Sequence, residues 1–190
     1  VTAWGWDDHG QSNVPDGLST VVAISGGYDH SLALHSDGTV TAWGSDSQGQ
    51  ISVPDGLSDV VDISAGDRHS YALKSDGTVV HWGDDVTAGF DMTVPDGISD
   101  VVALETYKWT PLALKSDSTV VAWGYNNAGQ SDEPSDLSGV INVRAGAYHT
   151  IALKSDGTAV HWGSTGAGRG DIPDGLVAAS ISSDDCVQDC

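Results

Sequence analysis

Short apolar runs alternate with polar turns along this chain, and the runs recur at nearly constant spacing. One unit illustrates the pattern with four runs, at Val60–Ser64, His69–Lys74, Thr78–Trp82 and Met92–Val94. The runs are too short for helices, contain alternating or β-branched apolar residues, and are bounded by Gly, Asp or Pro. The pattern therefore predicts an all-β chain of short antiparallel strands, which we label A to D within each unit.

Two phrases repeat in step with these runs. The phrase ALKSDGTVVHWG at residues 72–83 recurs in close variants, and the Trp-Gly pairs begin at spacings of 39, 39, 41 and 39 residues. A second phrase, VPDGLS at residues 14–19, returns at the same period. In both phrases Asp-Gly supplies the backbone angles of a tight turn. Four short strands in about 40 residues is the spacing of one blade of a β-propeller.

The repeated pattern carries a family resemblance. The pattern G-x-x-H-[ST]-x-A-L-K-S-D-G-T-V-x-x-W-G, which begins at residue 66, resembles the RCC1 repeat (regulator of chromosome condensation), in the short form of bacterial propellers of the BLIP-II type. The resemblance covers residues 1–183, interpreted as one propeller domain of about five repeats of ~39 residues, followed by an acidic Cys-containing tail at residues 184–190. It implies a propeller that binds proteins through one face, but the repeat itself specifies no activity.

The strand count is uneven. The chain supplies five A, four B, five C and five D strands, beginning with a C strand at Val1–Gly5 and ending with an A strand at Val177–Ser182. Three arrangements fit this count: a five-bladed ring with one blade short of a strand, an arc of a larger ring, or a blade completed by a strand from another copy. An unpaired edge strand is a template for pairing with a second chain.

Side chains that occur once per unit are interpreted as scaffold. Neighbours along a strand point to opposite faces, and a catalytic set is not expected in several copies. This argument excludes three pairs that resemble a base beside a nucleophile, namely His30-Ser31, His69-Ser70 and His149-Thr150. We expect these histidines to be hydrogen-bonded to the adjacent turn. His81 and His161 could bind a metal only with a third ligand in a shared channel.

The sequence lacks the pattern of a metal or catalytic site. The pairs Asp7-Asp8 and Asp84-Asp85 do not form a calcium-binding loop. An enzyme would be expected to show a non-repeated cluster of acid, base and Arg near the central channel, and the sequence shows none. We therefore predict a non-enzymatic protein with no cofactor and no metal site.

Positions at which the repeats differ are the better guide to function. In an antiparallel meander the A–B and C–D loops share one face, and the SDG and VPDGLS turns share the other. The segment ETYKWTP at residues 105–111 departs most from its counterpart SGGYDHS at residues 25–31. Aromatic residues and Arg in variable loops are typical of protein-binding hot spots. The predicted partner-binding residues are Trp6, Tyr28, Arg68, Phe90, Tyr107, Lys108, Trp109, Tyr125 and Tyr148.

A net charge of −20 narrows the range of partners. The excess of carboxylates repels phosphate backbones and anionic lipids, so neither nucleic acid nor a membrane surface is expected as a partner. No apolar run is long enough to insert into a bilayer. Cys186 and Cys190 could form a small disulfide, pair with another chain or stay free. A cysteine pair and a high charge together favour an extracellular or cell-surface location.

Two functions fit these observations. The first is a binding or structural module that engages a macromolecular partner through the face of the A–B and C–D loops. The alternative is a self-assembling subunit of an extracellular filament or surface layer, which would use unpaired edge strands or the C-terminal cysteines. The expected partner is accordingly a protein or a second copy of this chain.

Overall fold

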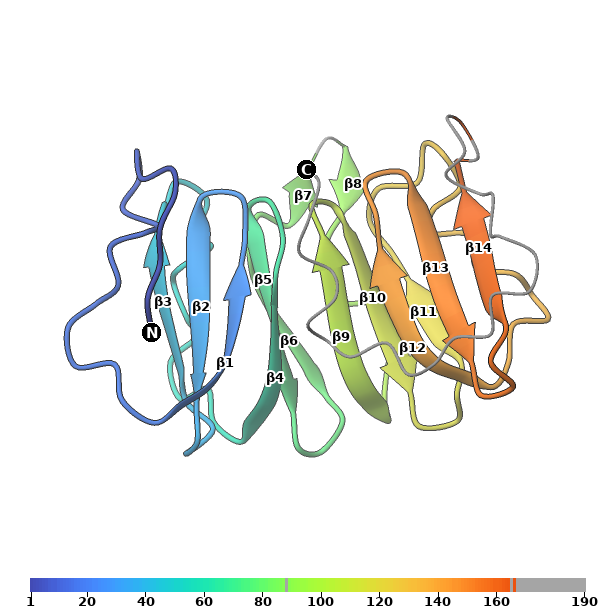
Figure 1. The fold of residues 1–190 in the computed structure, drawn as a ribbon, viewed down its shortest axis with the longest axis horizontal. Helices are drawn as coiled ribbons and strands as arrows, with labels where there is room; N and C mark the ends of the chain where they lie inside the picture. The colour runs from blue at the N-terminus through green and yellow to red at the C-terminus, as the bar shows by residue number, and fades with distance from the viewer. Residues whose placement is uncertain (88, 165, 167–190) are drawn as a thin grey trace.

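The computed structural model describes residues 1–87, 89–164 and 166. Four three-stranded antiparallel sheets lie side by side in chain order, and we name them blades 1 to 4 (Figure 1). A short hairpin of β7 (Val86–Thr87) and β8 (Phe90–Asp91) follows blade 2. The A, B and C strands of blade 1 are β1 (Val21–Gly26), β2 (His30–His35) and β3 (Val40–Gly44), and those of blade 2 are β4 (Val60–Ala65), β5 (His69–Lys74) and β6 (Val79–Gly83). Those of blade 3 are β9 (Val101–Tyr107), β10 (Thr110–Lys115) and β11 (Val120–Ala122), and those of blade 4 are β12 (Val140–Ala145), β13 (His149–Lys154) and β14 (Ala159–Gly163).

These elements confirm the all-β prediction. No helix within the described ranges is long and apolar enough to cross a membrane. In every blade the strand order is A-B-C with antiparallel pairing, so each A–B and B–C connection is a hairpin.

The repeated Asp builds the B–C turns. In blade 2 the Asp76 Oδ1 accepts hydrogen bonds from the backbone N–H of Thr78 (3.0 Å) and from its hydroxyl (2.6 Å). These bonds hold the pKa of the Asp76 carboxyl below its usual value. Gly77 between them has a φ of 81°, which a residue with a Cβ adopts only at a cost. The same two bonds recur in the other three blades.

The D segment, predicted as a fourth strand of each unit, is not part of the blade sheets. After β3 the carbonyl of Gln50 accepts hydrogen bonds from two side chains of blade 2, the Trp82 indole N–H (2.9 Å) and the Ser70 hydroxyl (2.9 Å). These side chains satisfy the backbone acceptor, and Pro54 has no N–H to donate, so the segment needs no ladder partner. The four-strand prediction is therefore wrong, and the D segment instead ties one blade to the next.

The predicted C strand at Val1–Gly5 is not a strand either, although its sequence VTAWG is identical to that of β3. A strand forms only beside a hydrogen-bonding partner, and the sheets of the described residues begin with β1. Trp4 is consequently 84% exposed, whereas the Trp of each later WG pair is 6–7% exposed. The predicted A strand at Val177–Ser182 lies outside the described residues.

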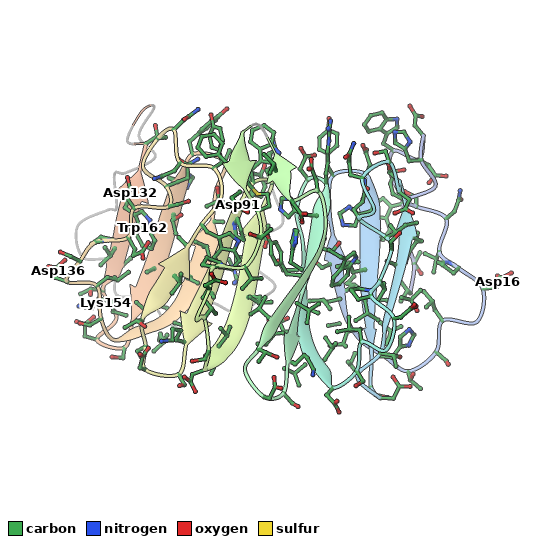
Figure 2. The ribbon with its side chains drawn as sticks, turned by 180° about the vertical axis from the view of Figure 1, so that it is seen from behind. Asp16, Asp91, Asp132, Asp136, Lys154 and Trp162 are labelled. Carbon is green, nitrogen blue, oxygen red and sulfur yellow. The ribbon has the colours of Figure 1, made fainter. Side chains whose placement is uncertain are left out.

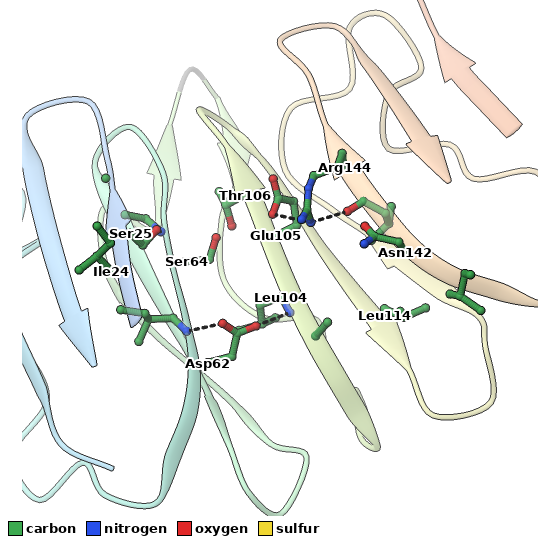
Figure 3. A pocket seen from close by; sticks show the side chains of 16 residues that line it. Ile24, Ser25, Asp62, Ser64, Leu104, Glu105, Thr106, Leu114, Asn142 and Arg144 are labelled. Atoms are coloured by element: carbon green, nitrogen blue, oxygen red, sulfur yellow. Dashed lines mark hydrogen bonds and ion pairs between the residues drawn. The ribbon is translucent and has the colours of Figure 1, made fainter. Parts of the chain in front are cut away.

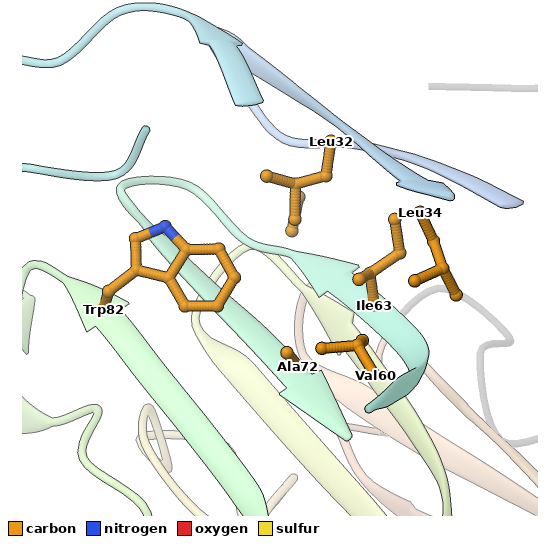
Figure 4. Close-up of a cluster of buried hydrophobic side chains, with 7 residues drawn as sticks. Leu32, Leu34, Val60, Ile63, Ala72 and Trp82 are labelled. Atoms are coloured by element: carbon orange, nitrogen blue, oxygen red, sulfur yellow. The ribbon is translucent and has the colours of Figure 1, made fainter. Parts of the chain in front are cut away.

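The core lies between neighbouring blades (Figure 4). Leu32 and Leu34 of β2 pack against Val60, Ile63 and Trp82 of blade 2. Equivalent clusters join blades 2 and 3 and blades 3 and 4. Full burial of one such side chain stabilises the fold by roughly 1.5–3 kcal/mol. Trp82, Trp123 and Trp162 thus fill the space between neighbouring blades.

Backbone hydrogen bonds hold the A–B turns of blades 1 to 3 in a row. The N–H of Tyr28 donates to the carbonyl of Gly66 (3.1 Å), and the N–H of Asp67 donates to that of Lys108 (2.9 Å). The start of each C–D loop is bonded in the same way to the A–B turn of its own blade. These loops therefore share one face, the upper edge in Figure 1, as predicted. We call it the loop face, and it comprises A–B turns 27–29, 66–68, 107–109 and 146–148 and C–D loops 6–13, 45–52, 84–93 and 125–132.

Candidate functional site

The A–B turn of blade 3 has a different shape from the others. In blade 2 a Cβ added to Gly66 would lie 2.1 Å from the His69 Nε2, so the histidine ring requires a glycine at this position. In blade 3 the histidine is replaced by Thr110, and the glycine can be replaced by Tyr107. The strands then pair up to these two residues, and the two-residue turn between them begins at Lys108 with a φ of 50°. This turn projects an ammonium and an indole from the loop face.

Four of the predicted aromatic residues lie together. The ring of Tyr125 is at the centre, with centroid distances of 4.9 Å to Phe90, 5.4 Å to Trp109 and 6.4 Å to Tyr148. We call these four residues the aromatic cluster. The Trp109 indole N–H donates to the Asp67 Oδ2 (2.6 Å), which fixes the indole against the neighbouring turn. The cluster thus joins the β7–β8 hairpin, blade 3 and blade 4.

The other predicted residues lie beside the cluster rather than in it. Trp6 and Tyr28 form a separate edge-to-face pair, 6.5 Å between centroids, and are 59% and 58% exposed. The Lys108 ammonium lies 5.6 Å from the Tyr107 ring centroid, and Arg68 is exposed on the A–B turn of blade 2. A hollow of about 340 Å³ separates the two aromatic groups. Its lining residues are Tyr28, Asp29, Asp67, Arg68, Lys108 and Trp109.

A second polar site lies where the A strands face a common recess of about 690 Å³ (Figure 3). The Arg144 Nη1 is 3.3 Å from the Glu105 Oε2. Asp62 accepts hydrogen bonds from the backbone N–H groups of Ile63 (2.9 Å) and Leu104 (3.2 Å). Burial raises the pKa of both carboxyls, and the Arg144 charge opposes this rise. This group of two acids and an Arg is not repeated from blade to blade, and the sequence analysis did not identify it.

The sequence analysis missed Asp62, Glu105 and Arg144 because they are 43 and 39 positions apart, on the A strands of three different blades. Each member is engaged by the protein itself. Glu105 and Arg144 neutralise each other, and Asp62 of blade 2 binds the backbone of blade 3. Ser25 links blades 1 and 2 in the same way, because its Oγ accepts the Ala65 N–H (3.0 Å). The arrangement is a set of links between blades.

The histidines make a different contact from the predicted one. His30 Nε2 lies 2.9 Å from the Ser70 Oγ of the next blade, so this hydrogen bond is not made to the adjacent turn. The Ser70 hydroxyl donates to the Gln50 carbonyl, so the histidine is the donor in this pair. Burial lowers the pKa of His30 to about 4 and that of His69 to about 3. A hydroxyl already donated to a carbonyl is not available as a nucleophile, which agrees with a scaffold role.

His81 and the two cysteines are the remaining residues proposed for a metal site or a disulfide. His81 Nδ1 lies 3.5 Å from the Asp85 Oδ1, on one side of the β6 strand. In the part of the chain that is described, no group of three or more His, Cys, Asp or Glu side chains could hold a metal ion. The predicted disulfide residues, Cys186 and Cys190, lie outside the described residues.

Comparison with known proteins supplies the family. The model of the regulator of chromosome condensation (RCC1) repeat matches residues 21–50, 60–89 and 140–169. These segments include the A–B turns of blades 1, 2 and 4, and the divergent turn of blade 3 falls between them. No curated protein matches the sequence.

Solved structures share the fold. Prp20p from Saccharomyces cerevisiae is 22% identical with a TM-score of 0.63, over 78% of this chain and 47% of that chain. The ectodomain of the Physcomitrella patens receptor kinase CR4 is 23% identical with a TM-score of 0.68, over 85% and 46%. Human WBSCR16 is 20% identical with a TM-score of 0.61, over 75% and 47%. The matched region thus spans about half of each structure. The chain therefore contains RCC1 repeats in three places, and its all-β fold is that of the RCC1-like β-propeller structures.

Proposed function

We propose that this chain is a non-enzymatic, extracellular or cell-surface module that binds a protein partner through its loop face. Two structures of related fold support a protein partner. The structure of Prp20p is described with its binding to Gsp1p and histones, and yeast RCC1 has been solved with Kap60 bound. The proposal carries over only the class of partner, because those chains are about twice as long and share little sequence.

The aromatic cluster is the observation that carries this proposal. Its central residue, Tyr125, stands where the other blades have Ser45, Asp84 and Ser164, so the scaffold does not require a ring there. Partly exposed aromatic rings gathered from four loops bury apolar area on contact at a small cost in side-chain entropy. A cluster of this kind on variable loops is typical of a protein-binding surface.

Charge does not select the binding face, because acids are spread over the molecule. Figure 2 shows Asp91 and Asp132 nearer the loop face, and Asp136 beside Lys154 nearer the opposite face. The overall field still makes nucleic acid and anionic membranes poor partners, in keeping with a net charge of −20. The proposal requires no cofactor.

The test compares two indole deletions. Trp109→Ala removes a ring of the cluster, whereas the matched control Trp4→Ala removes an indole that is 84% exposed and outside the cluster. Proteins captured by the immobilised chain are identified, and the affinity of the captured partner is then measured. We expect Trp109→Ala to weaken binding by about 30-fold or more, the size of a hot-spot contact, with an unchanged melting temperature. Equal effects of both changes, or no effect of Trp109→Ala, would refute the proposal.

A second candidate function, self-assembly, is favoured by one further observation. Ile24 of blade 1 is 65% exposed, whereas the residues at its position in the later blades are 4–8% exposed because a preceding blade covers them. An apolar residue that is covered in every other blade suits a contact with another copy. Light scattering tests this, with Ile24→Lys compared against Val22→Lys. Val22 is 63% exposed on the same strand, and its counterparts in later blades stay exposed. Assembly that is insensitive to Ile24→Lys would exclude this contact.

A further inference from the structure

Two cations on the loop face have no acidic partner among the described residues. Arg68 and Lys108 form no ion pair with any described residue, although the chain carries a net charge of −20. Every other Lys or Arg in the described ranges is paired. Their partners lie at 3.3–3.9 Å, in the pairs Lys74–Asp76, Lys115–Asp117, Lys154–Asp156 and Arg144–Glu105. In so acidic a protein, two unpaired cations need an explanation.

The same two cations line one hollow. Arg68 and Lys108 lie on neighbouring A–B turns and line the cavity of about 340 Å³ between Tyr28 and Trp109. The turns are held in register by the backbone bond from the Asp67 N–H to the Lys108 carbonyl (2.9 Å). The spacing of the two cations is therefore set by the main chain.

The two acids of the hollow are engaged elsewhere. The Asp67 Oδ2 accepts the Trp109 indole N–H at 2.6 Å. The Asp29 Oδ2 lies 3.9 Å from the His9 Nε2, and the other Asp29 oxygen is buried with no hydrogen-bond partner among the described residues. The hollow thus presents two cations between two aromatic walls, and the Asp67 carboxylate is already bonded to the Trp109 indole.

We propose that this hollow binds a carboxylate of the partner, from an acidic side chain or from a chain terminus. This inference rests on the proposed function and names the group by which the partner is anchored. The Arg68 guanidinium can donate two parallel hydrogen bonds to a carboxylate, and the Lys108 ammonium adds a point charge. The rings of Tyr28 and Trp109 cover the aliphatic part of the same residue. The recognised acid is local, because the field of the whole chain disfavours a partner that is acidic overall.

Small probes test the site without the partner. N-acetyl-glutamate amide presents a side-chain carboxylate, N-acetyl-glycine presents a terminal one, and N-acetyl-glutamine amide is the neutral control. Binding is followed by NMR, through the Trp109 indole N–H and the Arg68 guanidinium signals. We expect a saturable shift with at least one acidic probe and none with the neutral one. The acid that binds more tightly identifies the source of the carboxylate. Absence of a saturable shift with either acid, or an equal shift with the neutral probe, would overturn the proposal.

Substitutions locate the binding. We expect Arg68→Gln or Lys108→Gln to lower the affinity for the acidic probe by about tenfold, which corresponds to the loss of one charged hydrogen bond. Lys108→Arg should retain the affinity, because it keeps the charge. The matched control is Lys74→Gln, which removes an ion-paired cation from the opposite face. An equal loss in the control would show a general charge effect and would refute the site.

The same variants separate this inference from the proposed function. If Trp109→Ala abolishes partner binding while Arg68→Gln and Lys108→Gln leave it intact, the loop face binds a protein but the carboxylate inference is wrong. If the acidic probes bind in the hollow and no partner depends on the aromatic cluster, the carboxylate site is correct and the proposed function fails.

Discussion

The interface between blades 1 and 2 and the interface between blades 2 and 3 satisfy one backbone acceptor in different ways. In the first, the Gln50 carbonyl accepts the Ser70 hydroxyl and a Trp indole N–H. In the second, Pro111 stands at the position of Ser70 and has no hydroxyl. The Met92 carbonyl accepts the Trp123 indole N–H (3.2 Å) from blade 3 and the Tyr71 hydroxyl from blade 2. In both interfaces the backbone carbonyl thus accepts two side-chain hydrogen bonds, although a different residue supplies one of them.

The same replacement explains the unpartnered histidine. His30 bonds to Ser70 across the first interface at 2.9 Å. At the second interface Pro111 stands in place of Ser70, and neither ring nitrogen of His69, the counterpart of His30, has a hydrogen-bond partner among the described residues. The replacement of Ser by Pro111 thus leaves the buried His69 ring without a hydrogen bond, whereas the Tyr71 hydroxyl supplies the one that the Met92 carbonyl would otherwise lack.

The largest expected effect on stability comes from removing the Tyr71 hydroxyl that bonds to the Met92 carbonyl. Tyr71→Leu installs the residue that occurs at the same position in blades 1 and 3, but it deletes the hydroxyl and the edge contact with Trp123, 5.6 Å between centroids. We expect a loss of about 2–4 kcal/mol in the free energy of unfolding, measured with urea. Pro111→Ser should recover about 1 kcal/mol in the Tyr71→Leu background and less in the wild type. Equal effects of Pro111→Ser in both backgrounds would show that the two positions are not coupled.

An intermediate effect is expected from pH. Burial lowers the pKa of His30 to about 4 and that of His69 to about 3 in the folded chain, below the value of 6.5 for an unperturbed histidine. The unfolded chain therefore binds more protons below pH 6.5, and stability that is present above that pH is lost as the pH falls toward 4. The slope is at most about 1.4 kcal/mol per pH unit for each histidine.

The variant His69→Thr isolates this contribution, because it copies the residue found at that position in blade 3. We expect the free energy of unfolding of the variant to fall less steeply than that of the wild type between pH 6.5 and 5. Comparing slopes cancels the opposite contributions of Asp62 and Glu105, whose pKa values are raised. Identical slopes would mean that His69 does not titrate differently in the folded and unfolded chains.

The smallest effect concerns the B–C turns. Ser118 replaces the glycine of the other three B–C turns and has a φ of 66°. Because glycine adopts this conformation without steric cost, Ser118→Gly should stabilise the chain by about 0.5–1 kcal/mol in thermal unfolding. Gly77→Ser, the reverse change in blade 2, should destabilise it, since a Cβ there would lie 3.1 Å from the Asp100 backbone. A stabilising Gly77→Ser would contradict this account.

Repetition made most of the fold predictable from the sequence. Two phrases at one period located the A, B and C strands and assigned the loops to two faces. The D segment was misjudged because its backbone acceptor, the Gln50 carbonyl, bonds to side chains of the next repeat, and no pattern within one unit reveals such a bond. The spacing of apolar runs in the sequence does not identify the hydrogen-bond partners of their backbone groups.

The candidate site was only partly predictable, for a related reason. Variable aromatic residues such as Trp109 and Tyr125 could be found by comparing repeats, since the scaffold does not demand them. That these two rings would meet, and that Trp6 would not join them, depends on loop paths that the sequence does not specify. The link between Glu105 and Arg144 was missed because the two residues lie 39 positions apart, on the A strands of two different blades. Whether the predicted residues bind a partner stays a prediction.

The row of A–B turns has a consequence for how this protein can change. Tyr28 and Lys108 are side chains of different chemistry, yet the turn of each is bonded to the neighbouring turn through its main chain, by the Tyr28 N–H and the Lys108 carbonyl. A substitution at such a position alters what the surface recognises while leaving the distances between turns intact. Affinity for a new partner can therefore evolve one residue at a time, without a prior loss of folding that a compensating mutation would have to restore.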